Sequence, residues 1–139
     1  MRKLLILATI LFFNSLTFAQ NSIKGKWLTE DKEGIVEIYI ENGKYFGKLI
    51  WLKKPNDDKG NPLTDSQNPN PKLNLRPLLN LVIISDMHLE INEWGGGTIY
   101  DPETGKSYRC KLWLSDNNTL NVRGYIGILY ETEKWVRVK

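Results

Sequence analysis

The chain has 139 residues and carries 19 Lys and Arg against 16 Asp and Glu, which gives a formal net charge of +3. Two of the basic residues are Arg2 and Lys3, so the remainder is nearly balanced, with 17 basic and 16 acidic residues. Nucleic-acid-binding domains concentrate Lys and Arg on one face, and this composition does not favour such a face. We therefore expect no nucleic-acid partner.

The first residues have the pattern of a secretory signal peptide. Arg2 and Lys3 precede residues 4–13, which are apolar except for Thr9, and the small residue Ala19 offers a cleavage point. An apolar run of this length is too short to span a bilayer. We predict that residues 1–19 are removed and that residues 20–139 form one exported domain, periplasmic or secreted, without a transmembrane segment.

The rest of the chain shows short β-strands joined by turns and no convincing helix. Period-two alternation predicts strands over residues 25–29, 35–41 and 44–53, and Asn42-Gly43 is a strong hairpin signal between the last two. The remaining predicted strands are residues 81–85, 87–93, 94–100, 106–114, 119–125, 128–131 and 134–138. The pattern thus predicts about nine or ten strands.

A long Pro-rich loop, residues 55–77, interrupts this succession of strands. Structureless loops of this length are uncommon in compact domains and often have a function or cover another element. Four leucines toward its end could hold it against a barrel mouth or a sheet edge: Leu73, Leu75, Leu78 and Leu79.

The glycines at 95–97 follow Trp94 directly and predict a bend, or a place where something approaches the backbone closely. We expect the long loop or a neighbouring aromatic side chain to approach there, with a ligand as the less favoured alternative. Residues 101–105 then form a tight turn, because Pro102 presets one dihedral angle and Gly105 accepts a positive φ.

Cys110 is the only cysteine, so an exported chain can form no intramolecular disulfide. Tyr108, Cys110 and Leu112 share one face of a predicted strand by alternation. We expect Cys110 to be a small core residue and not a nucleophile.

Successive short antiparallel strands predict an all-β meander. We favour a small closed barrel over a sandwich, because closure removes the exposed sheet edges that a meander otherwise leaves. The glycines along the strands supply the bends that closure of a small barrel requires.

Several motifs across the chain resemble those of DUF2147, a family of exported bacterial proteins. They are Gly25-x-Trp27-Leu28-Thr29, Val36-Glu37-Ile38-Tyr39, Gly43-x-Tyr45-x-Gly47-Lys48-Leu49-Ile50-Trp51-Leu52, Asn68-Pro69-Asn70-Pro71, Arg76-Pro77-Leu78-Leu79, Trp94-x-Gly96-Gly97-x-Ile99-Tyr100-Asp101-Pro102, Gly105-Lys106-x-Tyr108-x-Cys110 and Leu120-x-Val122-Arg123-Gly124-Tyr125-x-Gly127. The resemblance implies a lipocalin-like or calycin-like β-barrel in the periplasm, of uncharacterised function and with no catalytic residues. Asn80 stands where the resemblance leads us to expect glycine.

The Gly25-x-Trp27 pair also resembles the first-strand signature of lipocalins. In that family the tryptophan closes the base of the barrel beneath an arginine from a late strand. Arg123 or Arg137 is positioned to take that part here, with a guanidinium group against an aromatic face.

Few residues in the chain suggest catalysis. His88 is the only histidine, and Ser85 and Asp86 lie too near it along the chain to form a catalytic triad easily. We expect His88 to be a surface residue on a polar strand. Glu37 and Glu41 share an outward strand face and not a cleft, so they do not form a glycosidase pair.

The sequence therefore predicts that the protein is not an enzyme and that it uses no cofactor. It contains no glycine motif for a phosphate or a dinucleotide. One histidine and one cysteine do not give a zinc site. The acidic segment 57–65 offers oxygen ligands for calcium but lacks EF-hand spacing, and we expect a solvated loop there.

The chain contains five tryptophans and six tyrosines, which either fill a small barrel or line a pocket within it. The residues that we predict to line such a pocket are Tyr45, Trp51, Tyr100 and Tyr108, with Arg76 or Arg123 at the rim. This set would bind one small amphipathic or lipid-like ligand that carries an anionic or polar head group. The alternative is a filled barrel that serves as an envelope protein-interaction module through the loop at residues 55–77.

Overall fold

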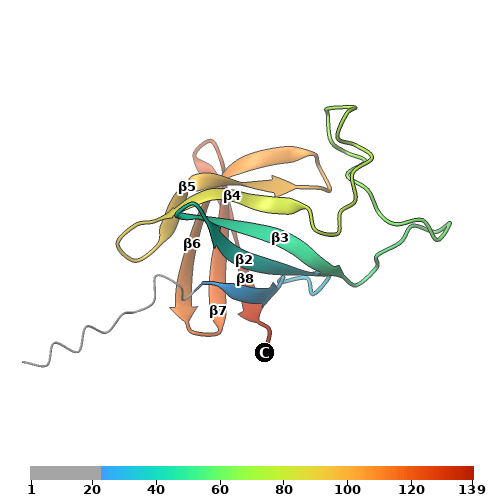
Figure 1. Cartoon of the computed structure of the whole chain (residues 1–139). Coiled ribbons are helices and arrows are strands. Elements are labelled where there is room, and N and C mark those ends of the chain that lie inside the picture. The colour runs from blue at the N-terminus through green and yellow to red at the C-terminus, as the bar shows by residue number, and fades with distance from the viewer. Residues whose placement is uncertain (1–22) are drawn as a thin grey trace, which may run out of the picture.

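The computed structural model describes residues 23–139, and the predicted signal peptide lies outside them. The described chain is all-β (Figure 1). Its strands are β1 (Gly25–Leu28), β2 (Gly34–Glu41), β3 (Lys44–Leu52), β4 (Val82–Leu89), β5 (Trp94–Asp101), β6 (Lys106–Asp116), β7 (Thr119–Ile126) and β8 (Leu129–Arg137). Each strand pairs with the next in antiparallel order, and β1 pairs with β8 to close the barrel. The predicted meander barrel is therefore confirmed.

The barrel has eight strands where nine or ten were predicted. At two positions where the sequence predicted that one strand ends and another begins, the structure has one continuous strand. Asp86 adopts a φ of 59° and lies where β4 has one extra residue opposite β3, so the strand bulges and continues. Residues 131–134 pair with β7 without interruption, which joins the last two predicted strands into β8.

Alternate residues of the strands point into the barrel, and their apolar side chains fill one end of it. Pairs such as Val36 and Ile38 on β2, and Leu120 and Val122 on β7, are buried two residues apart. Cys110 is buried as well, as predicted. Burial raises the pKa of its thiol to about 12, which keeps the group protonated and inert near neutral pH.

Trp27 and Arg137 close the base of this filled end. The Trp27 indole nitrogen donates a 2.9 Å hydrogen bond to the Ile23 carbonyl oxygen, and its ring is fully buried. The Arg137 guanidinium group lies 4.2 Å from the centre of that ring and donates hydrogen bonds to the carbonyl oxygens of Lys24 and Asn117. Of the two arginines left open by the sequence, Arg137 therefore covers Trp27.

The glycines at 95–97 form a bulge in β5, where Gly96 has a φ of 77° and β5 has one extra residue opposite β6. The bend was predicted. The long loop or a Trp, Tyr or Phe ring was expected to approach these glycines, but neither provides the nearest atoms. A Cβ atom at Gly97 would overlap the Ser85 carbonyl oxygen of β4. The long loop instead approaches Gly105, where a Cβ atom would overlap the Gln67 carbonyl oxygen.

The long connection between β3 and β4 forms the two green arms that project from the barrel in Figure 1. Each arm is held by short antiparallel bridges, Asn56 with Pro62 and Thr64 with Pro77. The connection returns to β4 through Asn80, whose φ of 69° explains why glycine was expected there, since asparagine tolerates this conformation.

Of the four leucines predicted to attach this connection, only Leu78 packs against the core. Leu73, Leu75 and Leu79 are exposed, Leu75 at 80 %, so that part of the prediction was wrong. The arms form backbone hydrogen bonds of their own, and three of the four leucines are exposed and do not attach them to the core.

Because Arg137 closes the base of the barrel, we expect removal of its side chain to destabilise the protein. Arg137→Met should lower the free energy of unfolding by about 1–3 kcal/mol, because the guanidinium group both covers the Trp27 ring and satisfies backbone carbonyl groups. Urea unfolding followed by tryptophan fluorescence measures this loss. Arg109→Met is the matched control, since Arg109 is exposed and its guanidinium lies only over the Tyr125 ring. Equal losses in the two variants would contradict the role given to Arg137.

Candidate ligand-binding pocket

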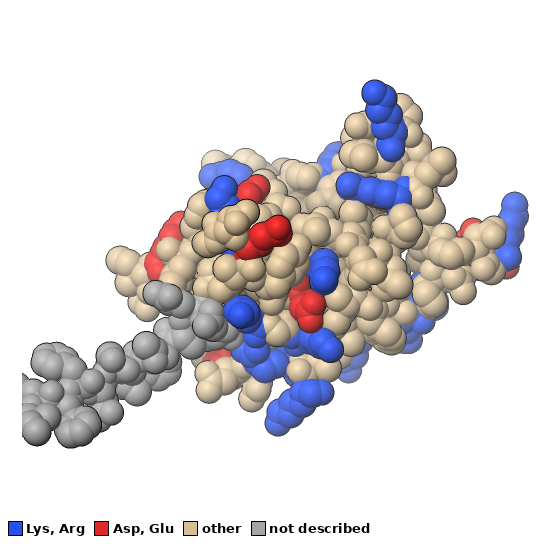
Figure 2. Space-filling model, in the orientation of Figure 1, with Lys and Arg blue, Asp and Glu red and all other residues tan. Residues whose placement is uncertain are grey.

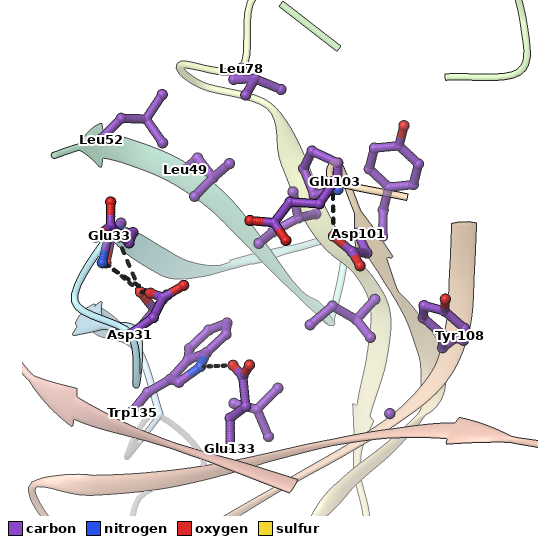
Figure 3. Close-up of a pocket in the computed structure, with 18 of the residues that line it drawn as sticks. Asp31, Glu33, Leu49, Leu52, Leu78, Asp101, Glu103, Tyr108, Glu133 and Trp135 are labelled. Atoms are coloured by element: carbon purple, nitrogen blue, oxygen red, sulfur yellow. Dashed lines mark hydrogen bonds between the residues drawn. The ribbon is translucent and has the colours of Figure 1, made fainter. Parts of the chain in front are cut away.

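A pocket of about 670 Å³ lies at the end of the barrel opposite Trp27 (Figure 3). The β1–β2 turn, the long connection and the β5–β6 turn surround its opening, and residues of β7 and β8 form one wall. Small-molecule pockets in proteins typically measure roughly 300–1,000 Å³. The volume is therefore of the size that holds one small ligand.

The inner wall of this pocket is apolar because the inward-facing positions of the strands continue into it. The apolar residues that line it are Leu49, Leu52, Leu63, Leu78, Ile83, Ile99, Val122, Ile126 and Trp135. Gly124 also lines the wall, and a Cβ atom there would meet its neighbours only at ordinary contact distances of 3.7 and 3.8 Å. The absence of a side chain at Gly124 leaves space that the surrounding backbone does not require to be empty.

Tyr100 and Tyr108 lie on the wall of the pocket, as predicted. Tyr45 points into the barrel but lies in the filled end, where its ring meets the Trp94 ring edge-on at 5.8 Å. The predicted tyrosines therefore divide between the pocket and the core.

Trp51 does not line the pocket, contrary to prediction, and is 43 % exposed. The reason is a bulge in β3: Ile35 of β2 pairs with Trp51 while Val36 pairs with Leu49, which leaves Ile50 as an extra residue. One extra residue reverses the faces of all residues beyond it. Leu52 therefore takes the inward position that alternation had assigned to Trp51.

Arg76 forms no part of the pocket wall and instead binds Asp65. The Arg76 Nε atom lies 2.9 Å from the Asp65 carboxylate, which also accepts hydrogen bonds from Tyr100 and Asn68. Asp65 is fully buried, so the prediction of a solvated loop at residues 57–65 was wrong for this residue. The four side chains join the long connection to β5 and place Leu63 and Leu78 against the pocket.

The donors around Asp65 also determine its charge. Burial alone would raise the pKa of this carboxyl group, but the hydrogen bonds from Tyr100, Asn68 and Arg76, with the positive charge of Arg76, outweigh burial and lower the pKa. The pKa of Tyr100 is raised by burial and by the adjacent carboxylate. The pair is therefore held as a phenol and a carboxylate near neutral pH.

Arg123 lies on the outer face of β7, because Val122 and Gly124 on either side of it point inward. Its guanidinium group lies 3.9 Å from the centre of the Tyr130 ring and 4.8 Å from that of Trp113, and its Nε atom donates to Thr132. Arg123 and Trp113 border a smaller hollow, of about 330 Å³, on the outside of the barrel. The placement of Arg123 at the rim of the inner pocket was therefore wrong.

The opening of the pocket is acidic. Six carboxylate residues contribute to its lining, Asp31, Glu33, Asp101, Glu103, Glu131 and Glu133, and Lys54 is the single lysine or arginine among the described lining residues. In Figure 3 the carboxylates of Asp31, Glu103 and Glu133 point toward the same space. An anionic head group, as expected from the two arginines, would meet like charge here.

Glu133 shows the effect of this environment most clearly. Its carboxylate accepts a 2.9 Å hydrogen bond from the Trp135 indole nitrogen at the pocket wall. Partial desolvation of the carboxyl group raises its pKa, and the negative charges of Asp31, Glu30 and Glu131 raise it further, while the Trp135 hydrogen bond lowers it. Burial and the nearby negative charges therefore both disfavour the ionised form of Glu133.

Comparison of the sequence with known protein families agrees with the geometry of the barrel. Residues 25–137 match the family described as "Uncharacterized protein conserved in bacteria (DUF2147)", which covers every strand of the barrel. This chain belongs to the DUF2147 family. The motif resemblance noted in the sequence is thereby confirmed.

The DUF2147 barrel is also similar to a solved structure described as "Protein HP1028 from the human pathogen Helicobacter pylori belongs to the lipocalin family". The two share 26 % sequence identity with a TM-score of 0.72, and the alignment covers 84 % of this chain and 83 % of that one. The lipocalin-like architecture is therefore shown by a solved neighbour. Among curated proteins, no match to the chain was found.

Other residues considered from the sequence lie away from the pocket of this DUF2147 protein. His88 is exposed on β4, and the carboxylate of nearby Asp86 pairs with Lys44 at 3.6 Å. Asp57 accepts backbone hydrogen bonds from Lys59 and Asn61 within its own turn. Within residues 23–139 no helix is long and apolar enough to cross a membrane.

The acidic opening was not predicted from the sequence, although part of its signal was present. Alternation along β8 places Glu131, Glu133 and Trp135 on one face, and Trp135 is buried. The acidic residues of the β1–β2 and β5–β6 turns could not be assigned to the same opening without the topology, because about 70 residues separate Asp31 from Asp101 along the chain.

The buried carboxylate predicts a pH-dependent contribution to stability. Asp65→Asn should lower the free energy of unfolding by about 1–3 kcal/mol near neutral pH, because charge-assisted hydrogen bonds from Tyr100 and Arg76 are weakened. Since the folded-state pKa of Asp65 is lowered, its stabilisation is present above the unfolded-state value of about 4 and is lost as the pH falls through the folded-state value. The difference between wild type and variant should therefore narrow below about pH 5.

Urea unfolding at a series of pH values measures this difference, and Asp57→Asn is the matched control on the same loop. Asp57 caps an exposed turn that asparagine caps equally well, so a change below about 0.5 kcal/mol is expected. A difference for Asp65→Asn that stays constant with pH would contradict the assignment of a lowered pKa.

Proposed function

We propose that this DUF2147 protein is an exported, non-catalytic binding protein whose barrel holds one small amphipathic or lipid-like molecule. The observation that carries the proposal is the pocket of about 670 Å³ with an apolar wall, at the open end of a lipocalin-like barrel. Burial of an apolar ligand surface against such a wall supplies the main driving force for binding.

The non-catalytic part of the proposal is supported by where the reactive side chains lie. The Cys110 thiol has a pKa of about 12 and is buried, so it is a poor nucleophile. His88 is on the outer surface, remote from the lining residues of the pocket. The remaining side chains able to donate or accept a proton are the carboxylates of the opening.

An interaction module remains the second candidate, because the long connection exposes apolar side chains. Leu75 is 80 % exposed, and Leu73 and Leu79 are exposed on the same connection. Exposed leucines on a projecting loop favour contact with another protein. On the face shown in Figure 2, basic and acidic side chains are interspersed, so we assign no charged docking surface there.

A pocket-filling variant tests the proposed function directly. Gly124→Leu adds an isobutyl group at a position whose Cβ fits without strain, so the barrel should fold with an unchanged or raised melting temperature. The neutral fluorescent probe N-phenyl-1-naphthylamine should bind the wild type saturably, and its affinity should fall about tenfold or more in the variant because the added atoms occupy the cavity.

Thr98→Leu is the matched control, since Thr98 is exposed and adjoins the inward-facing Ile99 on β5. This control places the same isobutyl side chain outside the barrel and should leave probe binding unchanged. Equal probe binding by wild type and Gly124→Leu would overturn the pocket. A wild type without probe binding, crosslinked through the long connection to an envelope protein, would support the interaction module instead.

Export is tested by the mass of the protein in the cell envelope. The chain expressed with its own leader should appear in the periplasmic fraction or in the medium with an intact mass that begins at Gln20, because cleavage follows Ala19. Leu7→Arg, which interrupts the apolar run, should leave the full-length chain in the cytoplasm. Full-length wild-type protein in the cytoplasm would contradict export.

A further inference from the structure

The distribution of charge around the pocket sets it apart from the rest of the molecule. The chain as a whole carries more basic than acidic residues, yet its pocket is lined by six acidic residues and one lysine. The acidic opening therefore does not follow from the composition. It leads directly into a cavity with an apolar wall, so the two features belong to one site.

Some of the six carboxylates have structural partners and can be set aside. Asp31 accepts hydrogen bonds from Thr29 and from the Glu33 backbone, and Asp101 accepts one from the Glu103 backbone, so both stabilise turns. Glu33 pairs with Lys53 at 3.9 Å. The other three carboxylates at the opening are Glu103, Glu131 and Glu133. None of them forms an ion pair among the described residues, and Glu133 accepts a hydrogen bond from the Trp135 indole nitrogen.

These three residues come from two separate parts of the barrel. Glu103 lies in the β5–β6 turn and Glu131 and Glu133 lie on β8, yet all three line the same pocket. Figure 3 shows the carboxylates of Glu103 and Glu133 directed into the cavity, with the Trp135 ring beside Glu133. Charges of one sign around a cavity with low-dielectric walls focus the electric field into it.

We infer that the pocket selects an amphipathic cation, a molecule whose apolar body enters the barrel while an amine or quaternary ammonium group stays at the carboxylate opening. This inference rests on the proposed function and adds the charge of the ligand to it. A cation at the opening would lie among these carboxylates and relieve the repulsion that Glu131 exerts on Glu133. A fatty-acid carboxylate would meet like charge there.

Three probes with one tail and different head groups test the inference: decyltrimethylammonium, decanoate and 1-decanol, each below its micelle or solubility limit. Calorimetry or displacement of the neutral fluorescent probe, at neutral pH and low salt, gives the affinities for the mature protein. Decyltrimethylammonium should bind about tenfold more tightly than decanoate, with 1-decanol between them. The ratio should shrink at high salt, which screens the carboxylates.

A triple variant identifies the carboxylates responsible. Glu103→Gln, Glu131→Gln and Glu133→Gln together should remove most of the preference for the cation and leave the affinity for 1-decanol unchanged, which also reports that the barrel is folded. Glutamine at 133 can still accept the hydrogen bond from Trp135. Glu37→Gln, Glu41→Gln and Glu90→Gln change the charge equally at residues that do not line the pocket and should keep the preference.

Replacement of Lys54 should change the preference for the cation in the opposite direction. Lys54→Gln removes the one lysine among the described lining residues and should strengthen the preference for decyltrimethylammonium over decanoate. Decanoate binding as tightly as the cation in the wild type would overturn the inference, while 1-decanol binding would leave the proposed function standing. Failure of all three probes to bind would overturn the proposed function and the inference with it.

Discussion

The structure depends on the closure of the barrel between its first and last strands. The β1–β8 ladder is short, with Trp27 opposite Arg137 and Leu28 opposite Val136 as its paired residues. The stack of Arg137 on Trp27 adds side-chain contacts to this short ladder at the base. Closure there fixes which end of the barrel is filled, and it leaves the other end to be shaped by the turns and by the long β3–β4 connection.

The architecture could be predicted because its signals are local. Asn42-Gly43 defines the β2–β3 hairpin, with φ values of 50° and 76°, and alternation along β6 identified Cys110 as a core residue. The choice between Arg123 and Arg137 was not local, because it depends on the register of β8 against β1. Trp51 was placed wrongly for a related reason: a single extra residue in β3 reverses the faces beyond it, and the local composition does not mark the bulge.

The candidate site was harder to predict than the fold because its residues come together only through tertiary structure. Asp65 lies in a polar, proline-rich segment, and the sequence gives no sign that Tyr100, 35 residues further on, satisfies its carboxylate. The acidic opening combines residues of two turns with residues of β8. Arg76 and Arg123 were expected to bind a ligand, but an arginine placed by sequence alone is free to pair with a buried carboxylate or with outer aromatic rings, and both occur here.

The cavity at the open end of the barrel is informative because its size is not imposed by the backbone. Protein interiors are close-packed, and a small barrel with no ligand gains stability by filling its interior with side chains, as this one does around Trp27 and Trp94. At Gly124 a Cβ atom would meet its neighbours at ordinary contact distances, and glycine is a poor strand former. A strand with glycine at a position where a Cβ atom fits, at the wall of a cavity with a charged opening, is less stable than it could be and leaves the cavity larger. That arrangement supports the proposed binding function over a barrel that is only a scaffold.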